Sequence, residues 1–559
     1  MPLPDTDRTW WFGLAGMLVA LVIPVFLVAV PPLLDYPNHL ARAYVLAVGR
    51  DDPFLSAMFG PRWGIIPNLA IDLIVPALMT VFDVHTAGRV TVAFSLILVV
   101  TGAIALSVAY FRQRSFWQLG AGLAAYNTLF LMGFINFQLA FGAALWSAAG
   151  WVRYRETVPI TIVTFSAAAS IAVFFFHMFG FIFFALLIGS YEIAEALKRY
   201  RRSEDAGARF LLRRAVALLV VLAPPLLLYG ISPARVTPGE AVWASIQDKS
   251  FYLFFPFLSY NLLVDAFLMA SVVSFILICA LFRKARYSLG AAICSVALIS
   301  LYFILPTGWK GGYFIDARIT VLLGLMLFIS VVPAGLPTPL RKAAATILVS
   351  IFVLKLSLIG LVWLRSERDV AAVRQVISDV PPGSRVLLSH VWTDVKDSPF
   401  GTLSVTSRRI PWVVEKYMHL AAFVLLDRHA FWSHVFAAES QQPLRVRRAY
   451  EDSWAGEFAP FPEDYKTLEQ ARIDSPFAHL RDWDKKFNYL LVLNADHAPD
   501  LRGFLPELLE FRTQIGIAAL FAVRKNQQAE EKGRSPEGVK RDSTDDEAIP
   551  SSAAMRGSD

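Results

Sequence analysis

Long apolar runs alternate with short polar segments through the first 364 residues of the chain and then stop. A helix needs about 20 consecutive apolar residues to cross the hydrocarbon core of a bilayer. Twelve runs approach this length, at 11–30, 64–82, 90–110, 119–135, 136–152, 159–176, 177–197, 215–231, 257–282, 289–306, 318–333 and 343–364. The pattern therefore predicts a polytopic α-helical membrane domain over residues 1–364, with about 11–13 transmembrane helices.

The segment after Leu364 has the composition of a water-soluble domain. It carries ordinary charge and turn signals such as Pro381-Pro382-Gly383. Apolar runs at 385–390, 488–494 and 516–523 are typical of buried strands, whereas 415–436 and 499–513 favour helices. We expect an α/β domain over 365–525, followed by a polar, disordered tail over 526–559.

Lysine and arginine concentrate in three short loops, and these loops predict the orientation of the chain. They lie at 198–214, 283–286 and 341–342, and basic loops face the cytoplasm. With Arg8 ahead of the first span, they predict a cytoplasmic N-terminus. The external segments are then loops 31–63, 232–256 and 307–317 and the C-terminal domain, which would be periplasmic if the protein resides in a bacterial inner membrane.

Twelve crossings would place both termini on one side of the membrane, so one predicted span must be miscounted. The weakest stretch is 119–152, where two short segments meet with no charged residue between them. A single bent crossing or a re-entrant pair there would restore an odd count, eleven or thirteen.

Composition supports a lipid environment and excludes several functional classes. Hydrophobic residues make up 56% of the chain, charged residues make up 17%, and the mean hydropathy is +0.51. The net charge of +7 resides in short loops, so it indicates topology and not a nucleic-acid surface. The two cysteines, Cys279 and Cys294, lie in predicted membrane helices and form no disulfide framework. No phosphate-binding loop, dinucleotide fingerprint or serine elbow is present, which argues against soluble nucleotide chemistry.

The segment after the first span holds the most informative polar residues. Asp35 follows two prolines, and Asn38, His39 and Arg42 come one to two helical turns later. If a helix begins at Pro37, Asn38 and Arg42 share one of its faces. An acid and a cation would then lie together at the membrane boundary. The alternative is that Asp35 caps this helix and Arg42 faces solvent.

This acidic residue in the first external loop, together with many apolar helices, long external loops and a C-terminal external domain, resembles the GT-C superfamily of membrane glycosyltransferases. The resemblance implies that Asp35 is the active-site aspartate that acts on the acceptor. It also implies a sugar donor attached to a polyprenyl-phosphate carrier, with no further cofactor. Family patterns often show consecutive acids, whereas Tyr36 follows Asp35 here, so a metal-dependent variant is unsupported.

Cations must stabilise the phosphate that leaves in such a reaction. The predicted loop before 318 offers Lys310 and Arg318, and its glycines permit close backbone approach. His177, between two apolar segments, is a further candidate for contact with the acceptor or the carrier phosphate, as are His39 and Arg42. The alternatives are that Lys310 and Arg318 anchor helices at the interface and that His177 is a hydrogen-bonded residue at a helix junction.

Two other classes of protein fit parts of the pattern. A transporter or flippase would use Asp72, His177 and Asp265 as a polar pathway across the bilayer. A non-catalytic scaffold would use only its external domain, to bind an envelope partner. Acids and bases lie mostly at helix ends, which favours the transferase. Histidines and acids of the C-terminal domain match no metal signature; they are His390, Asp394, His419, Asp427 and His429.

Overall fold

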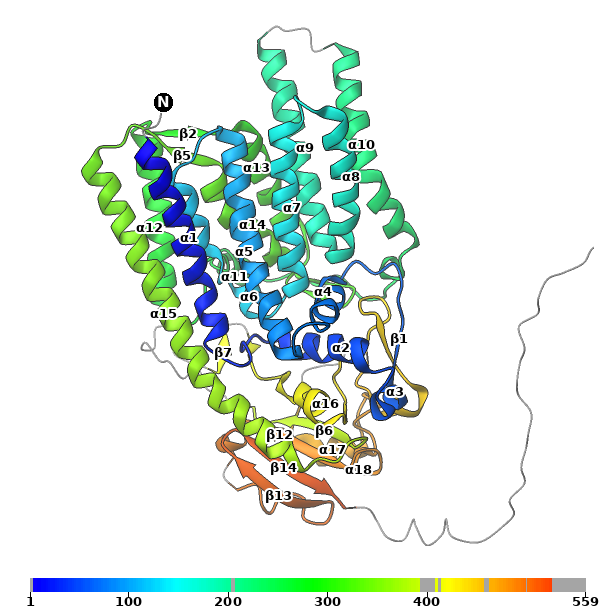
Figure 1. Ribbon diagram of the computed structural model, residues 1–559. Coiled ribbons are helices and arrows are strands. Elements are labelled where there is room, and N and C mark those ends of the chain that lie inside the picture. Colours follow the sequence, from blue (N-terminus) through cyan, green and yellow to red (C-terminus); the bar gives the residue numbers. More distant parts are fainter. Residues whose placement is uncertain are drawn as a thin grey trace, which may run out of the picture.

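The computed structural model describes residues 4–202, 207–392, 408–410, 414–456, 462–498 and 500–524. A bundle of long helices stands on a C-terminal α/β domain (Figure 1). We call the end of the bundle next to this domain the domain end. The long helices of the bundle are α1 (Pro4–Phe26), α5 (Val84–Phe111), α7 (Ile135–Tyr154), α8 (Pro159–Phe176), α9 (Met178–Arg201), α10 (Ala208–Ile231), α12 (Leu262–Leu281), α13 (Leu289–Ile304), α14 (Ile315–Ile329) and α15 (Thr338–Val376).

The distribution of apolar side chains confirms a membrane-spanning bundle. Seven helices of the described chain are long and apolar enough to cross a bilayer. The peripheral helices α8, α10 and α12 expose large apolar side chains such as Ile160, Leu227 and Leu281, which water would disfavour and lipid accommodates. Helix α7 is instead buried along most of its length. It packs closely on α5, because Gly142 leaves no room for a side chain beside Leu98.

One crossing of the bundle is not a regular α-helix. It consists of the 3-10 helix η1 (Phe116–Ala124) and the short helix α6 (Thr128–Leu131). At the end opposite the domain, the Trp10 indole donates to the carbonyl of Ser115, 3.1 Å away. At the domain end, the last residue of α6 accepts a hydrogen bond from the Leu34 amide, also at 3.1 Å. The segment therefore connects the two ends of the bundle.

Residues from other parts of the chain accept hydrogen bonds from backbone and side-chain donors of this irregular crossing. The Thr128 amide donates to the carbonyl of Phe255 at 3.1 Å, and the Trp117 indole donates to the carbonyl of Leu327 at 3.1 Å. Non-helical backbone at membrane depth is stable only when it is enclosed by protein in this way. The predicted span 119–135 is thus correct as a crossing but wrong as a continuous helix.

The predicted span over 64–82 is wrong. Only α4 (Ala70–Leu78) is helical there, and nine residues are too few to cross a bilayer. The apolar side chains of this helix face protein, with Ile71 and Val75 buried. Removing this span leaves an odd count of eleven, in agreement with the N-terminus and the C-terminal domain lying at opposite ends (Figure 1).

The segment between α1 and α5 is consequently longer than the predicted loop 31–63. It lies at the domain end and folds into a short layer between the bundle and the C-terminal domain (Figure 1). Its elements are α2 (Tyr36–Val48), α3 (Pro53–Met58), β1 (Phe59–Pro61) and α4. Strand β1 pairs with β10 (Leu444–Val446) of the C-terminal domain, which fastens the layer to that domain.

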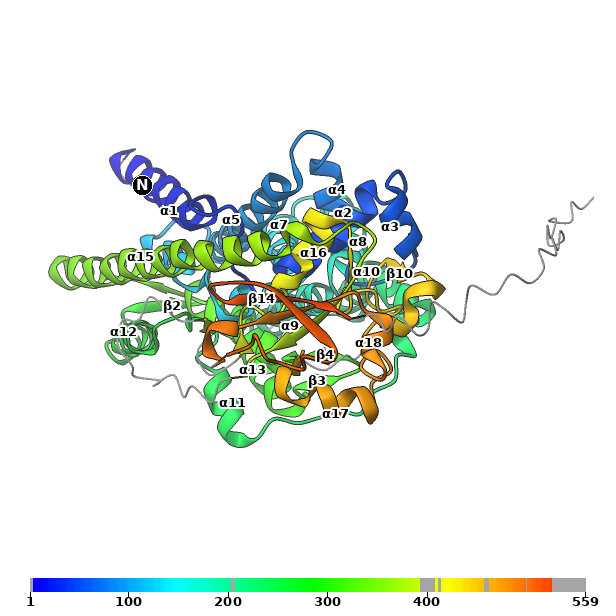
Figure 2. The same ribbon diagram turned by 90° about the horizontal axis from the view of Figure 1, so that it is seen from below.

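A mixed sheet forms the centre of the C-terminal domain. Its strand order is β11-β6-β12-β14-β13, and β9 pairs with β6. The pairs that join β11, β6, β9 and β12 are parallel, and those that join β12, β14 and β13 are antiparallel. The strands are β6 (Arg385–His390), β9 (Phe431–Trp432), β11 (Glu463–Asp464), β12 (Tyr489–Leu493), β13 (Leu509–Ile515) and β14 (Ala518–Val523). Figure 2 shows this sheet laid across the end of the bundle.

The three strands predicted in this domain are confirmed, and the two helices are not. Helix α16 (Phe423–Arg428) occupies only part of the predicted helix 415–436, because His429 adopts φ +49° and turns the chain into β9. In the predicted helix 499–513, the described residues form turns and bends over 500–508, and β13, which pairs with β14, begins at Leu509. Helix α15 also continues past the predicted boundary at 364 and reaches the domain. The predicted disordered tail lies outside the described residues.

Candidate active site

Backbone contacts fix Asp35 at the domain end of the bundle. Its amide donates to the carbonyl of Met132 at 3.1 Å. Gly133 adopts φ +81°, and a side chain there would meet the Asp35 amide nitrogen at 2.7 Å, so only glycine permits this approach. The Asp35 carboxylate makes no capping hydrogen bond to α2. The carboxylate is therefore not consumed by the helix it precedes.

The carboxylate of Asp35 pairs with a histidine of the C-terminal domain. His419 Nδ1 lies 3.2 Å from Asp35 Oδ1, and each side chain keeps 17% of its surface exposed. The rings of Trp432 and Phe436 stand edge-on to the imidazole, with centroid distances of 5.9 and 5.1 Å. Nothing in the local sequence around His419 signals this contact.

Arg318 places a cation against aromatic side chains of the bundle. It lies in the first turn of α14, partly buried, with its guanidinium carbon 5.0 Å from the ring centroids of both Phe134 and Phe179. Over the described residues, its side chain makes no ion pair and no hydrogen bond. Asp35 is near enough for its charge to act on the guanidinium. Since a partly buried cation without an ion pair gains from an anion or hydrogen-bond acceptors, this site is suited to an anion from outside the chain.

His177 lies at the junction between α8 and α9. Its Nδ1 accepts a hydrogen bond from the Phe179 amide at 3.1 Å and so caps α9. Its ring stands edge-on to Phe137 at 5.8 Å and lies within the field of Arg318. The structure thus brings His177 beside Arg318, while one of its nitrogens serves the capping role that the sequence left as the alternative.

His39 lies deeper in the same region. Burial, and then the neighbouring cation of Arg42, hold the pKa of His39 well below its ordinary value, so the ring is neutral near pH 7. His419 and His177 also act on this ring. Its Nδ1 is buried without a hydrogen-bond partner. His39 therefore lies with Asp35, His177, Arg318 and His419 in one group, which we call the domain-end cluster.

Arg42 and Asn38 fasten α2 to its surroundings. Arg42 donates to both oxygens of Asp72, at 2.7 and 2.9 Å, and both side chains are fully buried. Asn38 donates to the carbonyl of His434 at 2.8 Å and accepts from the amide of Phe436 at 2.9 Å. Sequence reasoning gave Asp72 no partner. The structure supplies one, and it joins α2 to α4.

Lys310 lies on a separate hairpin at the domain end. Its ammonium donates to the carbonyl of Arg235 and lies 5.0 Å from the Trp309 ring centroid. None of the contacts described for its side chain is with the domain-end cluster. The structure therefore does not bring Lys310 together with Asp35 or Arg318.

A buried ion pair sets the start of α14, two residues before Arg318. The ammonium of Lys249, on α11 (Ile246–Tyr252), donates to Asp316 at 2.9 Å and to the carbonyls of Tyr302 and Leu305. The Asp316 side chain is fully buried. This pair fastens the loop 232–256 to α13 and α14.

Replacing Lys249 with Met is expected to lower the free energy of unfolding by about 3–5 kcal/mol, because it leaves the Asp316 carboxylate buried and unpaired. The thermal midpoint of the detergent-solubilised protein measures the effect. The double variant Lys249→Met, Asp316→Asn should recover most of the lost stability. Equal stability of the single variant and the native protein would contradict the structural role of the pair.

The acids proposed for a transport pathway are separated into individual pairs. Asp72 pairs with Arg42, whereas Asp265 lies 3.1 Å from Lys355 and accepts from the Ser259 amide. His177 belongs to the domain-end cluster. Asp72, through Arg42, therefore adjoins the domain-end cluster that contains His177, whereas no contact described for Asp265 links it to the other two.

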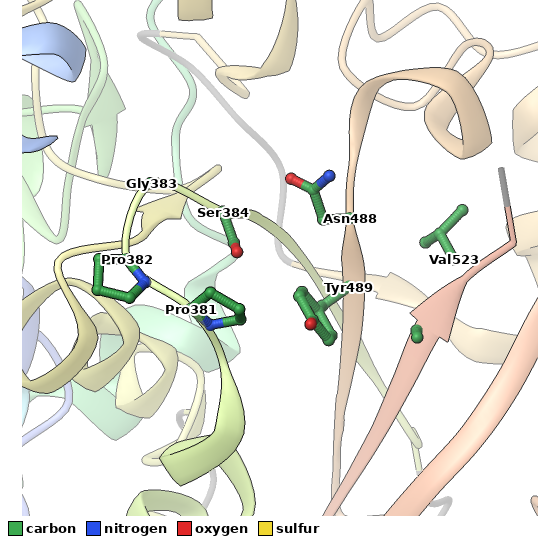
Figure 3. A pocket seen from close by; sticks show the side chains of 8 residues that line it. Pro381, Pro382, Gly383, Ser384, Asn488, Tyr489 and Val523 are labelled. Atoms are coloured by element: carbon green, nitrogen blue, oxygen red, sulfur yellow. The ribbon is translucent and has the colours of Figure 1, made fainter. Parts of the chain in front are cut away.

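Two further kinds of site were sought among the described residues, a metal-binding group and a surface pocket. Among the described residues, no group of three or more His, Cys, Asp or Glu side chains is arranged to hold a metal ion. A shallow surface pocket lies on the C-terminal domain (Figure 3). It is lined by Pro381, Pro382, Gly383, Ser384, Asn488, Tyr489, Ala522 and Val523. Asn488 is engaged there by the amide of Arg385, and tyrosine is the only ionisable lining residue.

The fold and the domain-end cluster define a polytopic membrane protein whose C-terminal α/β domain completes a polar site at one end of the bundle. No protein-family model and no curated protein matches the sequence. Among solved structures, the chain is similar to ArnT from Cupriavidus metallidurans in the apo state, with 11% identity, 93% of this chain and 98% of that chain covered, and a TM-score of 0.49. The same protein bound to undecaprenyl phosphate gives 11% identity, 92% and 97% coverage and a TM-score of 0.48.

The arabinofuranosyltransferase AftD from Mycobacteria is also similar, with 14% identity and a TM-score of 0.46. The match covers 92% of this chain and 40% of AftD. These are likenesses in overall arrangement. At such identities and TM-scores they assign no residue, substrate or activity to this chain.

Proposed function

We propose that the protein transfers a sugar from a polyprenyl-phosphate carrier to an envelope acceptor, a glycan, lipid or protein, at the outer face of a bacterial inner membrane. The observation that carries the proposal is that a carboxylate and a cation, each able to act on a substrate, lie in the same domain-end cluster. Asp35 offers a carboxylate that caps no helix, and Arg318 offers a cation that no described acid neutralises. A hydroxyl acceptor and a phosphate leaving group need these two groups together.

In this scheme Asp35 removes the proton from the acceptor hydroxyl. The hydroxyl oxygen attacks the anomeric carbon of the donor, and the bond from that carbon to the phosphate oxygen breaks. The electron pair of that bond leaves with the polyprenyl phosphate, whose charge Arg318 stabilises through charge-assisted hydrogen bonds. A single displacement of this kind inverts the anomeric configuration. The scheme requires no cofactor besides the lipid-linked donor.

The domain end suits such a reaction physically. The carrier lipid has to remain in the bilayer while its phosphate reaches the polar layer formed by α2 and the C-terminal domain. Arg318 lies in the first turn of a bundle helix, with its guanidinium carbon 5.0 Å from the ring centroids of Phe134 and Phe179. The aromatic side chains exclude water and so strengthen the attraction between the guanidinium and a phosphate.

Comparison of envelope glycans and glycolipids in cells with and without the protein tests the proposal. We expect one sugar to disappear from an envelope component and its polyprenyl-phosphate form to accumulate. The component that loses the sugar then serves as the assayed product. Unchanged envelope sugars together with a carrier-linked substrate trapped on the inner leaflet would instead identify a transporter or flippase.

A further inference from the structure

His419 gives the C-terminal domain a direct contact with the acid proposed for catalysis. Its Nδ1 lies 3.2 Å from Asp35 Oδ1, within ion-pair distance but without hydrogen-bond geometry. No other side chain of the described residues forms a hydrogen bond or ion pair with that carboxylate. The contact joins parts of the chain that are far apart in sequence.

The imidazole is held in a defined orientation by its surroundings. The Trp432 and Phe436 rings stand nearly perpendicular to it, at interplanar angles of 68° and 88°. Phe436 is itself fixed, since its amide donates to Asn38 on α2. A ring packed in this way loses little further rotational freedom when it holds the carboxylate, so it can fix one rotamer of Asp35.

We infer that His419 is a positioning residue for Asp35. It holds Oδ1 and leaves Oδ2 directed to the acceptor hydroxyl, so that the C-terminal domain sets the geometry of proton removal. This inference rests on the proposed function, because it assigns His419 a role through Asp35. A displacement of about 1 Å in a reacting group can cost about 100-fold in rate, which is the scale on which such positioning acts.

A second pair of the same kind supplies a matched control. His429 Nδ1 lies 2.7 Å from Asp52, and the pair joins the same layer of the molecule to the same domain. His429 also contacts the hydroxyl of Tyr44 at 3.1 Å. If such pairs only fasten the domain to the bundle, loss of either histidine has the same consequence.

The test measures the initial rate at which cells lacking the protein restore the envelope product after induction of each variant, divided by the amount of membrane-inserted protein. We expect His419→Ala to lower this rate by about 10- to 100-fold. His419→Asn should restore most of the rate, because its amide nitrogen occupies the place of Nδ1. His429→Ala should leave the rate unchanged.

Several outcomes overturn the inference. One is a native rate for His419→Ala in a background where Asp35→Asn is inactive; the proposed function would then stand without it. Another is an equal loss of rate for the variants at His419 and His429, which would indicate domain attachment alone. If His419→Ala fails to insert into the membrane, the rates of His419→Asn and His419→Gln are compared instead, since only Asn keeps a donor at the Nδ1 position. Equal rates for these two variants would overturn the inference. Activity of Asp35→Asn would instead reject the proposed function.

Discussion

Replacing Asp35 with Asn is expected to lower the rate of sugar transfer by about 10²- to 10⁴-fold, the range that a positioned general base contributes. Asparagine has the same shape as aspartate but cannot take the proton from the hydroxyl group of the sugar acceptor. The site is anchored through the Asp35 amide and Gly133, neither of which the substitution alters. The protein should therefore insert and fold as before. The rate of formation of the envelope product per inserted protein measures the effect.

Asp51→Asn provides the matched control for this experiment. Asp51 lies in the same layer between α1 and α5, and its side chain is exposed. Its replacement removes the same charge from the same part of the molecule and should not change the rate. A native rate for Asp35→Asn would remove this carboxylate from the mechanism and leave the proposed reaction without a base.

Arg318→Gln is expected to weaken binding of undecaprenyl phosphate by about 10- to 100-fold, corresponding to the loss of charge-assisted hydrogen bonds. The transfer rate should fall further, by about 10²- to 10³-fold, because charge grows on the phosphate as the glycosidic bond breaks. Binding to the detergent-solubilised protein can be measured by native mass spectrometry. The thermal midpoint should change little, since the substitution breaks no ion pair and no hydrogen bond among the described residues and removes only the contacts of the guanidinium with aromatic rings.

Arg374→Gln is a suitable comparison for Arg318. The Arg374 guanidinium also lies over a phenylalanine ring, that of Phe423 at 5.4 Å. Its charge, however, is neutralised by Asp427 at 2.6 Å. We expect Arg374→Gln to lower stability and to leave phosphate binding unchanged. The reverse pattern, with Arg318→Gln unstable and still able to bind the lipid at native strength, would show that Arg318 is structural.

The membrane domain could be predicted from sequence to the extent that lipid contact determines composition. Helices such as α8 follow directly from uninterrupted apolar runs. The same composition gave a false span at 64–82, because Ile71 and Val75 are buried by protein and not by lipid. An apolar run shows that its side chains avoid water, but it does not show whether they contact lipid or other protein side chains. The miscounted span was expected at 119–152, as a single bent crossing or a re-entrant pair, but two crossings lie there, and the first is irregular because its hydrogen bonds come from residues distant in sequence.

Individual residues of the site could be predicted from their neighbours in the sequence, whereas contacts between residues distant in sequence could not. Asp35 and Arg318 stand out as charged residues beside apolar runs, and the structure brings their charges within reach of each other. The partnership of Arg42 with Asp72 needs the turn between α2 and α4. The contact of His419 with Asp35 needs the whole C-terminal domain to be in place. Neither pairing leaves a pattern in spacing.

The irregular crossing formed by η1 and α6 also dictates an order of biogenesis. The groups that satisfy its polar atoms include the carbonyls of Phe255 and Leu327, and the ribosome makes these residues long after the crossing itself. Until they arrive, unsatisfied amides in hydrocarbon would cost several kcal/mol each. The crossing therefore completes its hydrogen bonds only after the chain has been synthesised as far as Leu327. Asp35, which hydrogen-bonds to its end, acquires its final position only when the nascent bundle closes.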